Sequence, residues 1–356
     1  MRNVERLPSD PSIGRSLAIV GALYAICMLA TAALAGAVGS PFVLWFRDAP
    51  LILGAMLVLI VLMGIFWDGG LIALALITET AWRKFGSTPA PMTVDAMRAK
   101  RFFTCGPGPT VMLLATAITI LGTSNITLVS LELLGDGTRW RDPFFWQLEG
   151  AFLQKIATLP IDTAAWDRLY HSAWGIELLA AFALVVIGRG PRIVLHYCAS
   201  MIVLFYVGRM LGVLNPVMGP AFHQPDVFAY LDGSATSEAM RLVASVMAAP
   251  VAQAVDSGGI LLGGVSAMPS LHVAMVAVTA YWLWRAARWT ALVTVPWVLL
   301  VWTSTVLLGW HYALDGAGGI VLAAASAWLA SRLLHAAGAG TTRPGLDLAP
   351  PRLQRH

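Results

Sequence analysis

Long apolar runs separated by short polar segments occupy most of the chain. Several runs reach the roughly 18 to 20 residues that a helix needs to cross a bilayer. A polar interruption at 67–70 lies inside the second run and indicates a kinked or tilted long helix rather than two crossings. The pattern predicts an all-α membrane helix bundle of about eight spans, at residues 16–36, 51–81, 109–131, 173–187, 193–214, 271–284, 290–308 and 312–334.

The composition excludes an ordinary soluble domain, because 58% of the residues are hydrophobic, 12% are charged and the mean hydropathy is +0.74. Cationic residues collect on the cytoplasmic side of short loops, and most Lys and Arg residues fall there if both termini are cytoplasmic. The Ala-, Gly- and Trp-rich composition indicates a GC-rich bacterial source. We therefore expect a multi-pass protein of the cell inner (plasma) membrane. A cleavable signal peptide is the competing interpretation of the first run, but that run is longer than a usual signal core.

Two stretches on the extracytoplasmic side are longer than simple connections. Residues 135–171 are rich in Trp, Phe and Leu, which predicts a helix in the membrane interface that covers or funnels a site. Residues 215–268 begin with Asn-Pro and Gly-Pro turns and end near a Gly-Gly turn.

The chain then divides into a two-span region with a basic cytoplasmic loop at 1–107, a membrane domain carrying both long loops at 108–336, and a disordered cytoplasmic tail at 337–356.

Two histidines stand at the starts of apolar helices, and the predicted orientation puts both at the extracytoplasmic face. His311 precedes Asp315 by four residues, so the two can share a helix face. The carboxylate can then bind one imidazole nitrogen and leave the other free as a nucleophile or base. His272 opens the sixth span, and only Leu271 separates it from a Pro-Ser pair. The alternative is structural: a hydrogen-bonded pair that closes a helix end, with Ser270 as a helix cap.

Other classes of protein fit the pattern less well. A transporter would hold ionisable residues near the midplane, in broken helices of two similar halves, and no internal repeat is visible. A haem-binding electron carrier would hold two histidines across a helical core without an acid at i+4. Cys27, Cys105 and Cys198 are too dispersed for a disulfide framework or a metal motif. The net charge of +4 belongs mostly to the cytoplasmic loops and excludes nucleic acid as a partner.

The histidine motifs resemble those of a known family. The sequence Pro-Ser-Leu-His at 269–272 resembles the Pro-Ser-Gly-His motif of the type 2 phosphatidic acid phosphatase superfamily. Ser304 with His311 and Asp315 resembles its Ser-Arg-x5-His-x3-Asp motif, although Thr305 stands where that motif has arginine. These departures are similar to the inositol phosphorylceramide synthase branch, which is related to fungal aureobasidin-resistance proteins. The resemblance covers roughly the last six spans and implies a six-helix catalytic core.

In that superfamily the histidine at the position of His311 attacks phosphorus to give a phosphohistidine. The aspartate at the position of Asp315 orients it, and the histidine at the position of His272 protonates the leaving oxygen. The resemblance implies no metal and no cofactor. This chemistry suits a phosphoryl centre, because its transition state spreads negative charge over oxygens that a few fixed donors can stabilise.

Four further residues are expected to bind the substrate phosphate. Ser270, Ser304 and the amide of Gly264 are candidate donors to phosphate oxygens. The superfamily also has a Lys-x6-Arg-Pro motif that this chain lacks, and Arg209 is the candidate for the missing positive charge. An arginine near the end of an apolar helix can also reach the lipid headgroups without a catalytic role.

The expected function is therefore an integral-membrane phosphotransferase that acts on lipid-linked phosphate at the extracytoplasmic (periplasmic) face. It would move a polyol phosphate head group from a donor lipid to a lipid or polyol acceptor, in the manner of inositol phosphorylceramide synthases. The alternative within the superfamily is a phosphatase of lipid phosphates or polyprenyl diphosphates. The choice depends on whether water or an acceptor alcohol reaches the phosphohistidine first.

Overall fold

The computed structural model describes residues 13–85, 102, 106–134, 139–188, 190–256 and 266–338. Within these ranges the regular structure is entirely helical, which confirms the predicted all-α class. The helices are α1 (Ile13–Val38), α2 (Ala49–Phe85), α4 (Gly108–Gly122), α5 (Ser124–Leu134), α6 (Asp142–Ala157), α7 (Thr163–Gly188), α8 (Pro191–Leu214), α9 (Pro220–His223), η2 (Pro225–Leu231), α10 (Ala235–Ala248), α11 (Val251–Asp256), α12 (Leu271–Ala286), η4 (Arg288–Thr290), α13 (Ala291–Leu307) and α14 (Ala313–Ala336).

The predicted spans correspond closely to these helices. In the described part of the chain, seven segments are long and apolar enough to cross a membrane, and one of them joins α4 and α5. The remaining predicted span, 271–284, is α12, which has only 16 residues. The protein is thus a multi-pass membrane bundle.

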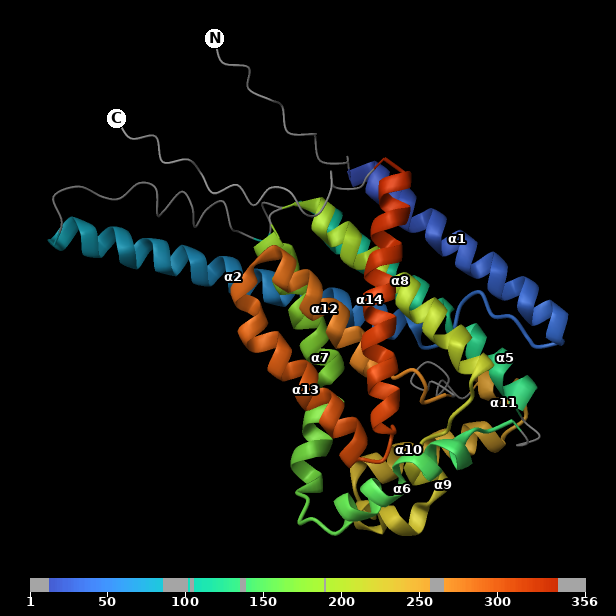
Figure 1. The fold of residues 1–356 in the computed structure, drawn as a ribbon. Coiled ribbons are helices and arrows are strands. Elements are labelled where there is room, and N and C mark those ends of the chain that lie inside the picture. Colours follow the sequence, from blue (N-terminus) through green and yellow to red (C-terminus); the bar gives the residue numbers. More distant parts are fainter. Residues whose placement is uncertain are drawn as a thin grey trace, which may run out of the picture.

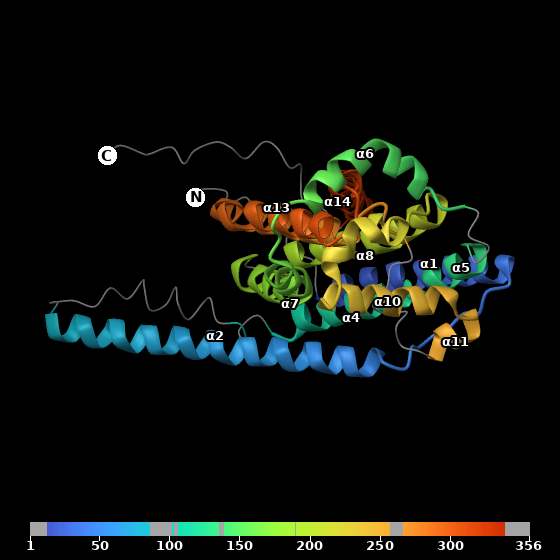
Figure 2. The same cartoon turned by 90° about the horizontal axis from the view of Figure 1, so that it is seen from below.

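The polar interruption at 67–70 does not break α2, which is continuous from Ala49 to Phe85. The carboxylate of Asp68 is buried and accepts a hydrogen bond from the backbone N–H of Phe102, 2.5 Å away. This contact satisfies the acid inside an otherwise apolar helix, so the helix needs no kink. Part of α2 extends well beyond the bundle (Figures 1 and 2).

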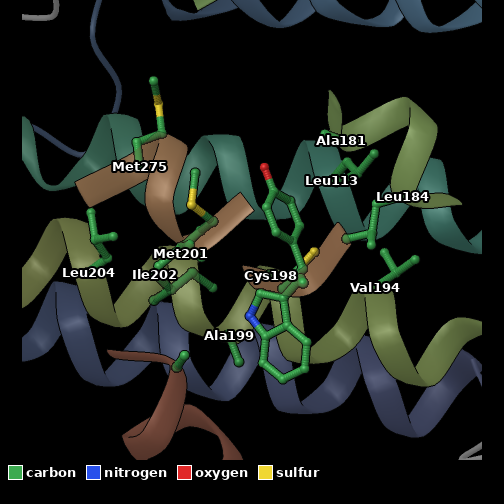
Figure 3. Close-up of a cluster of buried hydrophobic side chains, with 14 of the residues drawn as sticks. Leu113, Ala181, Leu184, Val194, Cys198, Ala199, Met201, Ile202, Leu204 and Met275 are labelled. Atoms are coloured by element: carbon green, nitrogen blue, oxygen red, sulfur yellow. The ribbon is translucent and has the colours of Figure 1, made fainter. Parts of the chain in front are cut away.

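The core of the bundle lies where α8 packs against α4 and α14, and where α12 packs against α7, α8, α13 and α14. Figure 3 shows this core, in which α8 contributes a dense row of buried side chains between α4, α7 and α12. Cys27 and Cys198 are buried, unpaired thiols within it, in keeping with a packing role, and Cys105 lies outside the described residues. Because the middle of the bundle is filled by apolar side chains, polar candidate site residues are expected at the ends of the helices.

Short helices cover one end of the bundle. The aromatic stretch 135–171 contains α6, and the second long loop contains α9, η2, α10 and α11. In Figure 1 α6, α9 and α10 lie together across one end of α7, α13 and α14, and Figure 2 shows α6 passing across the end of α14. A second cluster of buried side chains fills the space beneath them, with Phe145 and Leu153 of α6 against Tyr312.

Candidate active site

The N-termini of α12 and α14 meet at the covered end of the bundle. The backbone N–H of Ser270 donates to the carbonyl of Asp315 across 2.9 Å. Gly319 allows this approach, because a Cβ atom there would lie 2.6 Å from the carbonyl oxygen of Ser270. The two helix starts, and with them the two histidine motifs, are therefore fixed side by side.

His311 lies in the turn before α14 rather than on the helix, which begins at Ala313. Its Nδ1 is 3.4 Å from Oδ2 of Asp315, an ion-pair distance that is too long for a well-formed hydrogen bond. That same oxygen accepts the N–H of Tyr312 at 2.9 Å. Both side chains are almost fully buried, so the carboxylate is available to bind the imidazole without competition from bulk water. Catalytic hydrogen bonds are often long in the absence of substrate.

His272, in the first turn of α12, faces His311 with ring centroids 6.3 Å apart. Aromatic residues surround it: the Tyr170 ring is 4.8 Å away and the Trp174 ring 5.9 Å away, both from α7. The Tyr170 hydroxyl is 3.5 Å from Nδ1 of His272, and its ring also stacks on Trp310. The structure therefore brings His272, His311 and Asp315 together in apolar, aromatic surroundings.

The two serines make hydrogen bonds within their own helices. Ser270 is fully buried, and its Oγ accepts the N–H of Val273 at 3.4 Å as the N-cap of α12. The hydroxyl of Ser304 donates to the carbonyl of Val301 at 2.7 Å. Each oxygen retains capacity for a further hydrogen bond, so these contacts are compatible with a phosphate contact and do not require one.

Arg209 lies near the end of α8, where its guanidinium Nη1 donates to the hydroxyl of Thr127 on α5. Its Nε is buried without a hydrogen-bond partner. The described contacts of Arg209 do not include either histidine. It lines a small recess of about 20 Å³, whose other walls are Thr127, Ser130, Gly208, Gly212, Ser266 and Leu271. Leu271 directly precedes His272 in α12, and neither histidine lines the recess. Gly264 lies outside the described residues.

Two carboxylates of α6 bind backbone amides around the site. Glu149 accepts the N–H groups of Ala313 at 2.6 Å and Leu314 at 2.8 Å, in the first turn of α14. Asp142 accepts those of Met218 at 2.8 Å and Gly219 at 2.9 Å. These amides belong to a helix start and a turn, and lack partners within their own elements. The acids of α6 therefore satisfy groups that the bundle leaves exposed at its end.

Burial sets the protonation of the groups at this end. It raises the pKa of Glu149, although the amides of Leu314 and Ala313 partly oppose the shift, and the nearby Asp315 adds to it. The pKa of the Tyr312 phenol is also raised, first by burial and then by the carboxylates of Asp142 and Asp315. Tyr312 thus stays a neutral phenol beside these acids.

Tyr170, Asp142 and Glu149 are the contacting residues that reasoning from the sequence did not find. They belong to the aromatic stretch 135–171, which predicted only an interfacial helix over the site. No sequence motif marks this tyrosine or these two acids within the stretch. Their hydrogen-bond partners lie more than 70 positions away along the chain. Among the described residues, no three His, Cys, Asp or Glu side chains are grouped as for a metal ion.

Comparison with known proteins supports the resemblance at the level of the superfamily. A model of the PAP2 superfamily matches residues 152–329, from α6 to α14, which includes both histidine motifs. No curated protein and no solved structure matches the chain. The match confirms the predicted superfamily, while the inositol phosphorylceramide synthase branch stays a prediction. Because the match spans half of the 356 residues, the protein belongs to the PAP2 superfamily.

Proposed function

We propose that this membrane protein is a lipid phosphotransferase that moves a phosphate-bearing head group from a donor lipid to an acceptor alcohol. The observation that carries the proposal is the pair of imidazoles, His272 and His311, facing each other at 6.3 Å with the Asp315 carboxylate behind His311. Superfamily membership suggests phosphatase or phosphotransferase chemistry.

The reaction follows from the protonation of the two rings. Asp315 accepts a hydrogen bond from Nδ1–H of His311, so the lone pair of Nε2 attacks phosphorus and the bond from phosphorus to the donor lipid oxygen breaks. The anionic substrate favours the imidazolium form of His272, which gives its Nε2 proton to that leaving oxygen and becomes neutral. In the imidazolium form, Nδ1–H of His272 faces the Tyr170 hydroxyl oxygen, 3.5 Å away. The acceptor hydroxyl then returns its proton to His272 and displaces His311 from phosphorus.

Arg209, Ser270, Ser304 and the amide of Gly264 are the proposed phosphate contacts. Support is strongest for Arg209, because its Nε is buried without a partner and it lines the recess beside Leu271. A buried guanidinium without a carboxylate is costly, and an anionic substrate would offset that cost. Thr127, Ser130 and Ser266 line the same small recess, and their hydroxyls are further possible donors to a phosphate oxygen.

Transfer is favoured over hydrolysis because other parts of the chain cover the site. α6 and the second long loop pack over the histidine end of the bundle, and His311 is only 7% exposed. A covered phosphohistidine meets fewer water molecules, so an alcohol bound beside it can compete. The motif departures at Leu271 and Thr305 favour the same branch, whose members transfer inositol phosphate between lipids.

The site is proposed to face the periplasm. Arginines at the short connections and helix ends farthest from the histidines support this orientation, and they are Arg15, Arg192, Arg285, Arg288 and Arg332. Most of the Lys and Arg residues at the histidine end lie in the two long loops, which carry less weight in predicting orientation. Arg47, in the short connection between α1 and α2, is an exception.

The test uses purified protein in detergent with a panel of phospholipids, prenyl diphosphates and acceptor alcohols. Inorganic phosphate and new lipids are followed by mass spectrometry. A new phosphodiester lipid that forms only with an acceptor, and that is lost in His311→Ala, is the expected result. The exposed His335, at the far end of α14, gives the matched control His335→Ala, which should keep full activity. Arg209→Ala should raise KM more than it lowers kcat.

Two outcomes contradict this proposal in different ways. Phosphate release without an acceptor, lost in His311→Ala, identifies a hydrolase that uses the same residues. A fully active His311→Ala protein removes the phosphohistidine mechanism.

A further inference from the structure

The inner face of α6 is attached to the bundle by its acids and its apolar side chains. Phe145 and Leu153 are buried in the cluster beneath it, and Asp142 binds the turn at Gly219. Glu149 binds the amides of Ala313 and Leu314. Ala313 is two residues after His311, so the contact lies next to the nucleophile. A carboxylate at this helix N-terminus also interacts favourably with the helix dipole.

The outer face of α6 is apolar and uncovered. Phe144, Leu148 and Phe152 are 58%, 57% and 52% exposed. They are spaced by four residues, so they form one stripe along the helix. The stripe lies at the end of the spans, where Leu159 and Trp174 of the neighbouring turn and of α7 are also more than half exposed. Along the chain the stripe therefore leads, through Leu159, to exposed apolar side chains of the spanning helix α7.

α6 is too short to cross the membrane, because its 16 residues rise only about 24 Å and include Glu149, Lys155 and glutamines. A helix with an apolar stripe at the end of a membrane bundle fits the headgroup and acyl boundary of the bilayer. An apolar stripe of this size is costly to leave in water.

We propose that α6 binds the bilayer surface through the stripe of Phe144, Leu148 and Phe152, and that Glu149 is a positioning residue that holds His311. The bilayer contact keeps α6 in place, α6 keeps Glu149 on the first turn of α14, and that turn keeps the His311 imidazole directed at phosphorus. This inference rests on the proposed role of His311. It makes turnover of bilayer lipid depend on a helix that supplies no reacting atom.

The lipid contact is tested independently of activity. A spin label at Leu148→Cys, in a variant whose native cysteines are replaced by alanine, is placed in vesicles of phosphatidylethanolamine and phosphatidylglycerol. The label should be accessible to oxygen and protected from a water-soluble nickel reagent. Gln154→Cys, exposed on the polar side of α6, is the matched control and should show the reverse. Equal water accessibility at both positions overturns the lipid contact.

The positioning role is tested by kinetics in the same vesicles. Glu149→Ala should lower kcat about a hundredfold, as expected for a displaced catalytic group, and leave KM within a few-fold. Glu149→Gln should restore part of the loss, because its amide oxygen can still accept one N–H. Glu238→Ala removes an exposed acid of α10 and should be unchanged.

The triple change Phe144→Ser, Leu148→Ser and Phe152→Ser separates the two halves of the inference. It should slow turnover of vesicle lipid at least about tenfold, but spare a monomeric short-chain substrate that needs no bilayer. An active Glu149→Ala protein with unchanged kcat overturns the positioning role. Failure of the proposed function looks different: the unaltered protein would then show no turnover, while the spin-label result would still decide the lipid contact.

Discussion

The two histidines are held by different kinds of contact, and this difference separates their expected roles. His311 is paired with Asp315, which can accept its proton and strengthen the ring as a nucleophile. His272 has no carboxylate beside it among its described contacts; it lies between the rings of Tyr170 and Trp174. The anionic phosphate of a bound substrate would favour the imidazolium form of His272, which can give one proton to the leaving oxygen and suits a general acid.

This assignment predicts that the effect of His272→Ala depends on the leaving group. With a natural lipid alkoxide the variant should release the leaving group about a hundredfold more slowly, the usual contribution of a general acid. With a lipid phosphate ester of p-nitrophenol the loss should be much smaller, because that leaving group needs no proton. The rate of leaving-group release in a single turnover on each substrate provides the check, because the later step in which His272 takes the acceptor proton does not contribute to it; His223→Ala is the control. Equal losses on both substrates would mean that His272 does not act as the acid.

The candidate reacting groups could be named from the sequence because they lie in short motifs. The spacing of His311 and Asp315 and the Pro-Ser pair before His272 pointed to residues that the fold does bring together. Tyr170 and Glu149 could not be found, because nothing local marks them. Their importance comes from partners on other helices, and one sequence carries no direct signal of such long-range contacts.

At the scale of the element, the approach of α12 to α14 positions both motifs. A Cβ atom at Gly319 would lie 2.6 Å from the Ser270 carbonyl oxygen and 3.2 Å from the Ala274 nitrogen, both of them backbone atoms. Gly319→Ala should therefore push the helices apart and destabilise the fold by about 1 to 3 kcal/mol. Gly175→Ala on α7 is the matched control, because nothing lies within 4 Å of its Cβ. Thermal unfolding in detergent should show a lower Tm only for Gly319→Ala; equal shifts would contradict the close approach.

Burial of Glu149 predicts a specific dependence of stability on pH. Its folded-state pKa is raised above the ordinary 4.5, so the folded protein binds this proton more tightly than the unfolded chain. The stability from this group is then fully present below pH 4.5 and is lost as the pH rises through the folded-state pKa. Glu149→Gln cannot titrate. The Tm of the variant relative to the unaltered protein should therefore rise with pH between 4.5 and the folded-state pKa of Glu149. Above that pKa the difference in Tm should be constant.

The control for this measurement is Glu238→Gln, at an exposed position of α10. Its Tm difference from the unaltered protein should not follow the same curve. If the Tm difference for Glu149→Gln were also independent of pH, burial would not shift the pKa of this carboxyl.

The hydrophobic pattern predicted where the helices begin and end better than it predicted which helices contact one another. The second predicted span was one long helix, as the sequence indicated, because Asp68 finds its partner at Phe102 rather than in a break. The pattern also placed α12, whose start is fixed by Ser270. It could not show that α6 would attach through Asp142 and Glu149, because the amides that they bind become available only when α14 and the Gly219 turn are in place.

At the scale of the whole molecule, the orientation in the membrane decides which substrates reach the histidines. The charge pattern predicts that both termini lie in the cytoplasm and the covered end of the bundle in the periplasm. Asp232, exposed after η2, lies at the covered end, and Ala336 ends α14 at the other. In a cysteine-free background, a membrane-impermeant maleimide should label Asp232→Cys in intact spheroplasts and label Ala336→Cys only after lysis. The reverse pattern would place the site in the cytoplasm, where soluble phosphate esters would compete with lipids, and would remove the periplasmic acceptor from the proposed reaction.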